Sequence, residues 1–107
     1  MNTELVFLGR DNVNELAVTE DGQPIDFTSA TRMLLKFEGS GVVADSDVSS
    51  EFISWAADTI TLKLGSLAIV PSKYPGTLIV FDADHPNGQV LFHARDTEVI
   101  FWFVPED

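Results

Sequence analysis

The chain has 107 residues, of which 45% are apolar and eight are Phe, enough large side chains for the core of one domain. It contains no cysteine, which excludes disulfides, thiolate nucleophiles and cysteine-ligated metal centres. Seventeen Asp and Glu against six Lys and Arg give a net charge of -11, which disfavours nucleic acid and anionic membranes as partners. No secretory signal is visible at the N-terminus, and no apolar run approaches the ~20 residues of a membrane-spanning helix. We therefore expect one domain over residues 1–107, with no nucleic-acid or membrane partner.

The N-terminal part of the chain carries short stretches with the two-residue alternation of β-strands. Residues 5–8 and 16–19 are two weak strand candidates, and a turn at 20–24 combines Gly with Pro. At 28–31 the chain has the composition of a single helical turn, with Thr28 as its cap.

Two strands are predicted in the middle of the chain. In residues 31–38 the odd-numbered positions face the core, and Leu34 is an apolar residue on the outer face. Residues 39–50, rich in Gly, Ser and Asp, predict a long, weakly structured loop. Residues 59–64 are the clearest strand, with apolar side chains at every even-numbered position.

The C-terminal part alternates turns with apolar runs. Residues 77–81 and 99–104 are continuous apolar runs, typical of central strands or of an edge strand that another chain covers. Turns are predicted at 73–76 and 84–88, and residues 89–93 should return from the second turn as a hairpin strand. Together these segments predict an all-β fold, a single antiparallel β-sandwich of about seven to eight strands.

Two groups of acidic residues have some features of chemical sites. Asp82, Asp84 and Asn87 resemble an oxygen-rich calcium loop, but the spacing departs from that of an EF-hand. Asp45 and Glu51 belong to a carboxylate group that a hydrolase accessory domain would use, although an exposed acidic loop explains it more simply.

Nucleophilic catalysis and histidine-based sites find little support in the sequence. His85 and His93 are the only histidines, and nothing in the sequence places them together. No serine lies in the Gly-x-Ser-x-Gly arrangement of a hydrolase nucleophile. The sequence thus predicts a protein that is not an enzyme, with no catalytic residue, no metal and no cofactor.

The aromatic residues favour an interaction surface. Trp102 lies between Phe101 and Phe103, so in a regular strand either Trp102 or its two neighbours face outward. A carbohydrate-binding module that stacks sugar rings on Trp55 or Trp102 is the alternative interpretation.

Several segments, taken together, resemble the N-terminal immunoglobulin-like domain of phage baseplate upper proteins and related tail proteins. They are Arg-Asp-Asn at 10–12, Asp-Gly-Gln-Pro-Ile-Asp-Phe-Thr-Ser-Ala-Thr at 21–31, Tyr-Pro-Gly-Thr at 74–77 and the acidic hairpin at 81–88. Members of that family continue into a coiled coil or further domains, whereas this sequence ends at Asp107, which points to a small tail, neck or accessory virion protein.

The resemblance implies a non-enzymatic structural protein of a tailed phage or prophage. Such a protein is made in the host bacterial cytoplasm, resides in the virion, and binds other virion or tail proteins or further copies of itself. We expect its interface to consist of Leu34, Tyr74, Phe101, Trp102 and Phe103.

Overall fold

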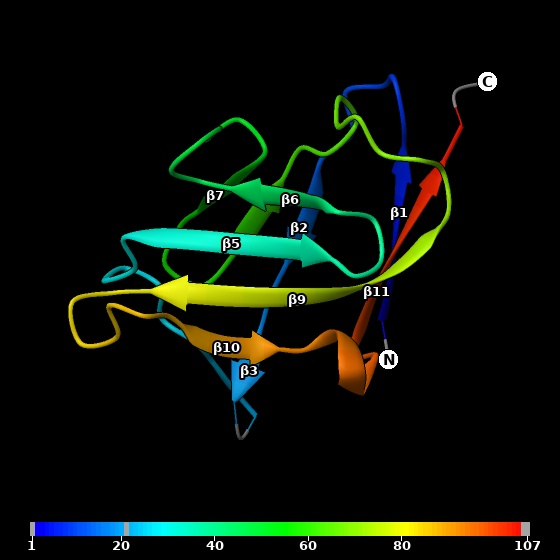
Figure 1. Cartoon of the computed structure of the whole chain (residues 1–107). Coiled ribbons are helices and arrows are strands. Elements are labelled where there is room, and N and C mark those ends of the chain that lie inside the picture. The colour runs from blue at the N-terminus through cyan, green and yellow to red at the C-terminus, as the bar shows by residue number, and fades with distance from the viewer. Residues whose placement is uncertain (1, 21, 106–107) are drawn as a thin grey trace.

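In the computed structural model, which describes residues 2–20 and 22–105, strands account for all of the regular structure except one 3-10 turn (Figure 1). The all-β prediction is therefore confirmed. The N-terminal strands are β1 (Asn2–Phe7), β2 (Asn14–Leu16), β3 (Thr19–Glu20), β4 (Gln23–Pro24), β5 (Arg32–Phe37) and β6 (Val42–Asp45). The C-terminal elements are β7 (Ile53–Trp55), β8 (Ile60–Leu62), β9 (Lys73–Phe81), β10 (Gln89–Phe92), the 3-10 turn η1 (Ala94–Asp96) and β11 (Val99–Val104).

The largest sheet has six strands in the order β1-β11-β9-β5-β6, and β10 also pairs with β9. Its other pairs are antiparallel, but β1 runs parallel to β11, so the sheet is mixed and the prediction of a purely antiparallel fold is wrong. Parallel neighbours need a long crossover connection, and here nearly the whole chain separates the two strands. Local turn signals cannot reveal such a pairing.

Strand β9 changes partners along its length. Its first residues pair with β11, and from Gly76 onward it pairs with β5. The turn predicted at 73–76 is therefore wrong, because Pro75 and Gly76 mark this change of partner inside one strand. Pro75 has no N–H to give to a ladder, and an added Cβ on Gly76 would lie 2.5 Å from Cε2 of Phe101.

A second sheet has three strands in the order β2-β8-β7 and shares its buried side chains with the large sheet in one cluster. The alternation predicted for 31–38 and 59–64 is confirmed, because Met33, Leu35, Ile60, Leu62 and Leu64 are all fully buried. Phe37 also belongs to this core, with its ring edge-on to those of Phe101 and Phe103. The core is thus a shared aromatic and aliphatic interior between the two sheets.

Two further predictions fail locally. Residues 39–50 contain the hairpin strand β6, which is joined to its partner β5 by a turn in which Gly39 and Gly41 adopt positive φ. Residues 28–31 form no helix; a turn there has the Ala30 N–H donating to the Phe27 carbonyl, and Asp26 accepts from the N–H of Thr28.

The predicted return strand at residues 89–93 is confirmed, since β10 pairs antiparallel with β9. None of the described segments forms a helix with the length and apolar character needed to cross a membrane.

Candidate interaction surface

An apolar patch lies on the outer face of β1 and β11. The parallel register sets Leu5 beside Trp102 and Phe7 beside Val104, and Ile100 shares that face two residues before Trp102. Leu5, Phe7 and Trp102 are each 41% exposed, and the other two are half-buried. These five residues are called the Trp102 patch below. Exposed large apolar side chains that gather on one sheet face are typical of a protein-binding surface.

Lys73 of β9 completes the row that contains Leu5 and Trp102. It pairs with Trp102 in the register, and its Nζ lies 4.4 Å from the centroid of the Trp102 ring. This cation–π contact holds the lysine stem along the indole and fixes the ring's orientation.

The open edge of β1, beside the patch, is covered by asparagine side chains. Oδ1 of Asn12 accepts from the Phe7 N–H at 3.0 Å, and Nδ2 of Asn12 donates to the Phe7 carbonyl at 2.9 Å. Nδ2 of Asn14 donates to the Leu5 carbonyl at 3.2 Å. Because these amides take the positions that a neighbouring strand would take, a partner meets the side chains of the patch and not the edge backbone.

The five predicted interface residues do not lie together on one surface. Trp102 faces outward, but Phe101 and Phe103 are 0% and 1% exposed in the core, so their assignment to the interface is wrong. Tyr74 is half-buried with its ring against Phe103, and its hydroxyl donates to the Val70 carbonyl. Trp102 alone among the five belongs to the patch.

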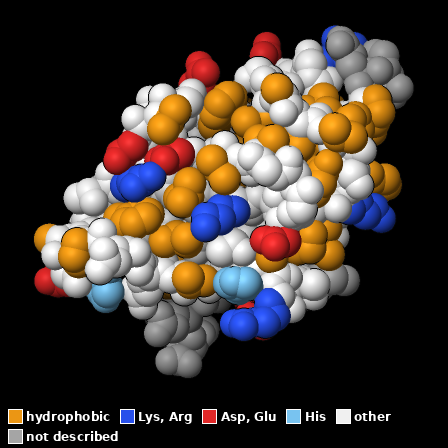
Figure 2. Space-filling model, in the orientation of Figure 1, with side chains coloured by type: hydrophobic (Ala, Val, Ile, Leu, Met, Phe, Trp, Pro, Cys, Tyr) orange, Lys and Arg blue, Asp and Glu red, His pale blue; other side chains and the backbone are white. Residues whose placement is uncertain are grey.

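Leu34 lies on a different part of the large sheet. It is on the outer face of β5, next to Ile79 of β9, which in turn pairs with the exposed Val90 of β10. Figure 2 looks onto this face and shows apolar side chains interspersed with basic and acidic ones. Leu34 and Trp102 therefore do not form one surface.

Sequence reasoning missed Leu5 and Phe7. Their spacing of two residues, with the buried Val6 between them, was the available signal. It was weak, because a single chain segment cannot show that its outer face continues across β11. Only the parallel pairing unites Leu5 and Phe7 with Trp102.

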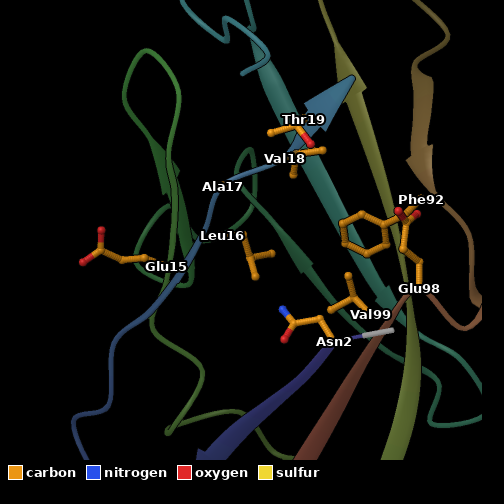
Figure 3. A pocket seen from close by; sticks show the side chains of 9 residues that line it. All are labelled: Asn2, Glu15, Leu16, Ala17, Val18, Thr19, Phe92, Glu98 and Val99. Atoms are coloured by element: carbon orange, nitrogen blue, oxygen red, sulfur yellow. The ribbon is translucent and has the colours of Figure 1, made fainter. Parts of the chain in front are cut away.

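A cavity with a volume of about 310 Å³ lies between β2 and the start of β11 (Figure 3). Leu16, Phe92 and Val99 point into it, while Glu15 points away. The remaining lining is Asn2, Ala17, Val18, Thr19 and Glu98. This lining brings no histidine or serine to the cavity, so neither a histidine-based site nor a serine nucleophile is assembled there.

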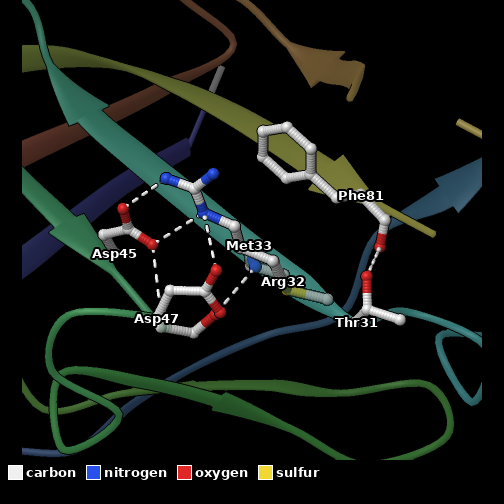
Figure 4. A network of polar contacts seen from close by, with 7 residues as sticks. Thr31, Arg32, Met33, Asp45, Asp47 and Phe81 are labelled. Carbon is white, nitrogen blue, oxygen red and sulfur yellow. Dashed lines mark hydrogen bonds and ion pairs between the residues drawn. The ribbon is translucent and has the colours of Figure 1, made fainter. Parts of the chain in front are cut away.

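The Asp45 carboxylate belongs to a structural ion pair, and its assignment to an exposed loop is wrong. Asp45 is only 9% exposed, and Oδ1 accepts from Nε of Arg32 at 2.9 Å (Figure 4). Asp47 lies 3.5 Å from the same Nε, and the Arg32 guanidinium also lies 4.8 Å from the Phe81 ring. The hydrogen bond from Arg32 lowers the pKa of Asp45 and raises that of Arg32. The cluster joins β5 to β6.

The two histidines have separate local roles. Nδ1 of His85 lies 2.9 Å from Oδ1 of Asp82 within the β9–β10 loop, and this hydrogen bond lowers the pKa of Asp82. His93 precedes η1 and accepts from the Arg95 N–H. Within residues 2–20 and 22–105, no three His, Cys, Asp or Glu side chains are grouped closely enough to hold a metal ion.

The second tryptophan lies at the margin of the core. Trp55 is partly buried and packs against the main hydrophobic cluster.

Comparisons of the chain with protein-family models, with curated protein sequences and with solved structures find no match.

Proposed function

We propose that this chain is a non-enzymatic structural protein of a tailed phage or prophage, with an immunoglobulin-like β-sandwich fold, that resides in the virion. It assembles with other tail or baseplate proteins by burying the Trp102 patch. The observation that carries this proposal is the exposed apolar face of Leu5, Phe7 and Trp102. The setting in a phage tail rests on the sequence segments described above, of which 82–88 forms the β9–β10 hairpin loop, whereas 74–77 lies within β9.

The area left exposed on Trp102 gives a scale for the interaction. Aromatic side chains bury 150–250 Å², so a ring that is 41% exposed has about 60–100 Å² left to bury, worth roughly 1.5–2.5 kcal/mol. Loss of this contribution weakens binding by about tenfold or more. Trp102 thus has the size and position of an interface anchor.

The test is incorporation into particles. A tagged chain, expressed in the strain that encodes it, should co-sediment with purified particles, and Trp102→Ser should reduce its incorporation at least about tenfold. Val48→Ser is the matched control, because Val48 is 83% exposed in a loop outside the patch. A wild-type chain absent from purified particles, or equal incorporation of the two variants, would contradict the proposal.

The alternative is a carbohydrate-binding module. It has less support, because Trp55 packs against the core and Lys73 lies over the Trp102 ring where a sugar would stack. A glycan array with the wild-type chain separates the two proposals: binding that Trp102→Ser abolishes would favour the carbohydrate module.

A further inference from the structure

We infer that the Trp102 patch binds an apolar segment of another protein that carries a carboxylate, and that Lys73 receives this carboxylate. This inference rests on the proposed function and names the chemistry of the partner. Its starting point is the position of Lys73, whose ammonium lies over the exposed Trp102 ring at the centre of an otherwise apolar row.

Lys73 is a cation without a counter-ion inside the described part of the chain. Among residues 2–20 and 22–105, no carboxylate forms an ion pair with it, whereas Arg32 is paired with Asp45. Covering Trp102 also removes water from Lys73. A partner that offered only apolar atoms would leave a desolvated, unpaired charge, which is costly.

The distribution of charge around the patch is unusual for so acidic a chain. The net charge is -11, yet residues 59–81 and 99–104 contain no Asp or Glu. Among the described residues of the large sheet, Glu38 is an exposed acid next to β9, and its N–H donates to the Pro75 carbonyl. Glu98 instead lines the cavity beside Phe92 and Val99.

Lys73 and the apolar side chains around it define a positive, apolar centre. A carboxylate between apolar side chains matches the centre, because it pairs with Lys73 while its neighbours cover Leu5, Phe7 and Trp102. A basic segment would be attracted to the molecule as a whole but would meet Lys73 at the point of contact. The local positive charge of the patch therefore disfavours basic partners, although the negative net charge of the molecule attracts them.

A second copy of this chain fits the patch less well. A two-fold interface centred on Trp102 sets the same residues of both copies against one another, so it brings two Lys73 ammonium groups together. Two molecules that each carry a charge of -11 also repel one another before contact. The occupant is therefore a different protein.

Selection of peptides on the folded full-length chain tests the inference. A displayed library of random linear dodecapeptides is enriched on the wild-type chain and counter-selected on Trp102→Ser. We expect enriched peptides to carry Asp or Glu flanked by apolar residues. The most enriched peptide and its Asp→Asn or Glu→Gln counterpart are then synthesised, and their Kd values for each variant are measured by calorimetry.

Charge variants give the decisive comparison. The amide peptide should bind the wild-type chain about tenfold more weakly than the acidic one, and this difference should vanish on Lys73→Met, which keeps the apolar stem. Lys73→Glu should lose binding of the acidic peptide. Lys63→Glu, which changes an exposed lysine outside the patch by the same charge, should bind it as the wild-type chain does.

Three outcomes would overturn the inference. They are a selection that yields no peptides dependent on Trp102, enriched peptides without an acidic residue, and an acidic peptide that binds Lys73→Glu unchanged. A solution mass of two chains that Trp102→Ser halves would instead identify a second copy as the occupant. If Trp102→Ser blocks particle incorporation while the charge variants have no effect, the proposed function stands and this inference fails.

Discussion

One added methyl group at Gly76 should destabilise the fold by a predictable amount. Gly76 is the residue at which β9 passes from β11 to β5, and a Cβ there would lie 2.5 Å from Cε2 and 3.0 Å from Cδ2 of Phe101. The same Cβ would lie 3.4 Å from Cε1 of Phe92. The Phe101 ring cannot move freely, because it is fully buried and packs edge-on against Phe37 at 5.2 Å.

Overpacking of this kind costs about 1–3 kcal/mol. For a domain of this length, 1 kcal/mol corresponds to a change in Tm of about 4–8 °C, so Gly76→Ala should melt about 4–24 °C below the wild-type chain. Thermal and urea unfolding followed by circular dichroism measure both quantities. The urea m-value should stay unchanged, since the substitution acts on packing in the native state.

A double-mutant cycle identifies the cause. Phe101→Leu makes room for the methyl group, so Gly76→Ala should cost less in the Phe101→Leu background than in the wild-type chain, with a coupling of about 1 kcal/mol. The steric reasoning is refuted if Gly76→Ala melts within about 1 °C of the wild-type chain, or if the two substitutions are additive.

Two other substitutions test the polar contacts. Arg32→Met should lower Tm at pH 7, and the difference in Tm from the wild-type chain should disappear as the pH falls. The pKa of Asp45 is lower in the folded state than its unfolded-state value of about 3.9, so the ion pair stabilises the fold above that value. This stabilisation is lost as the pH drops through the lower pKa of the folded state. Melting curves between pH 2 and pH 7 measure it, and a gap that stays constant over this range would contradict the assignment. Asn12→Ala removes both amide hydrogen bonds to Phe7, so it should cost about 1–2 kcal/mol and increase light scattering on storage by exposing the β1 edge. Unchanged melting and scattering would show that Asn12 does not protect this edge.

Much of the fold could be predicted because its signals are local. Alternation in residues 31–38 and 59–64 identified strands and their buried faces, since side chains in a strand point to opposite sides in turn. The Asn-Gly pair before β10 predicted the β9–β10 hairpin, because the backbone geometry of a turn is determined by a few neighbouring residues.

The errors arose where tertiary partners decide the structure. Pro75 and Gly76 have the composition of a turn, yet Phe101 on a distant strand uses the space above Gly76 and the chain continues extended. In the same way, Gly39 and Gly41 gave residues 39–50 the composition of a loop. The short strand β6 in this range is stabilised by its pairing with β5, which local composition does not reveal.

The candidate site shows the same division. The alternation of residues 101–103 predicted that either Trp102 or its two neighbours face outward, and in the structure Trp102 is the exposed residue. Which outward residues adjoin it depends on strand pairing, so Leu5 and Phe7 were missed and Leu34 was assigned to the wrong surface.

The parallel pairing of β1 with β11 also determines how the domain responds to tension. Because the two strands run in the same direction side by side, the N-terminal end of β1 and the C-terminal end of β11 lie at opposite ends of this ladder (Figure 1). A force that pulls these two points apart acts along the strands and loads all of the evenly spaced hydrogen bonds between them at once. The bonds must then break together instead of opening one after another from one end, so this ladder resists a force along its strands more strongly than a force across them.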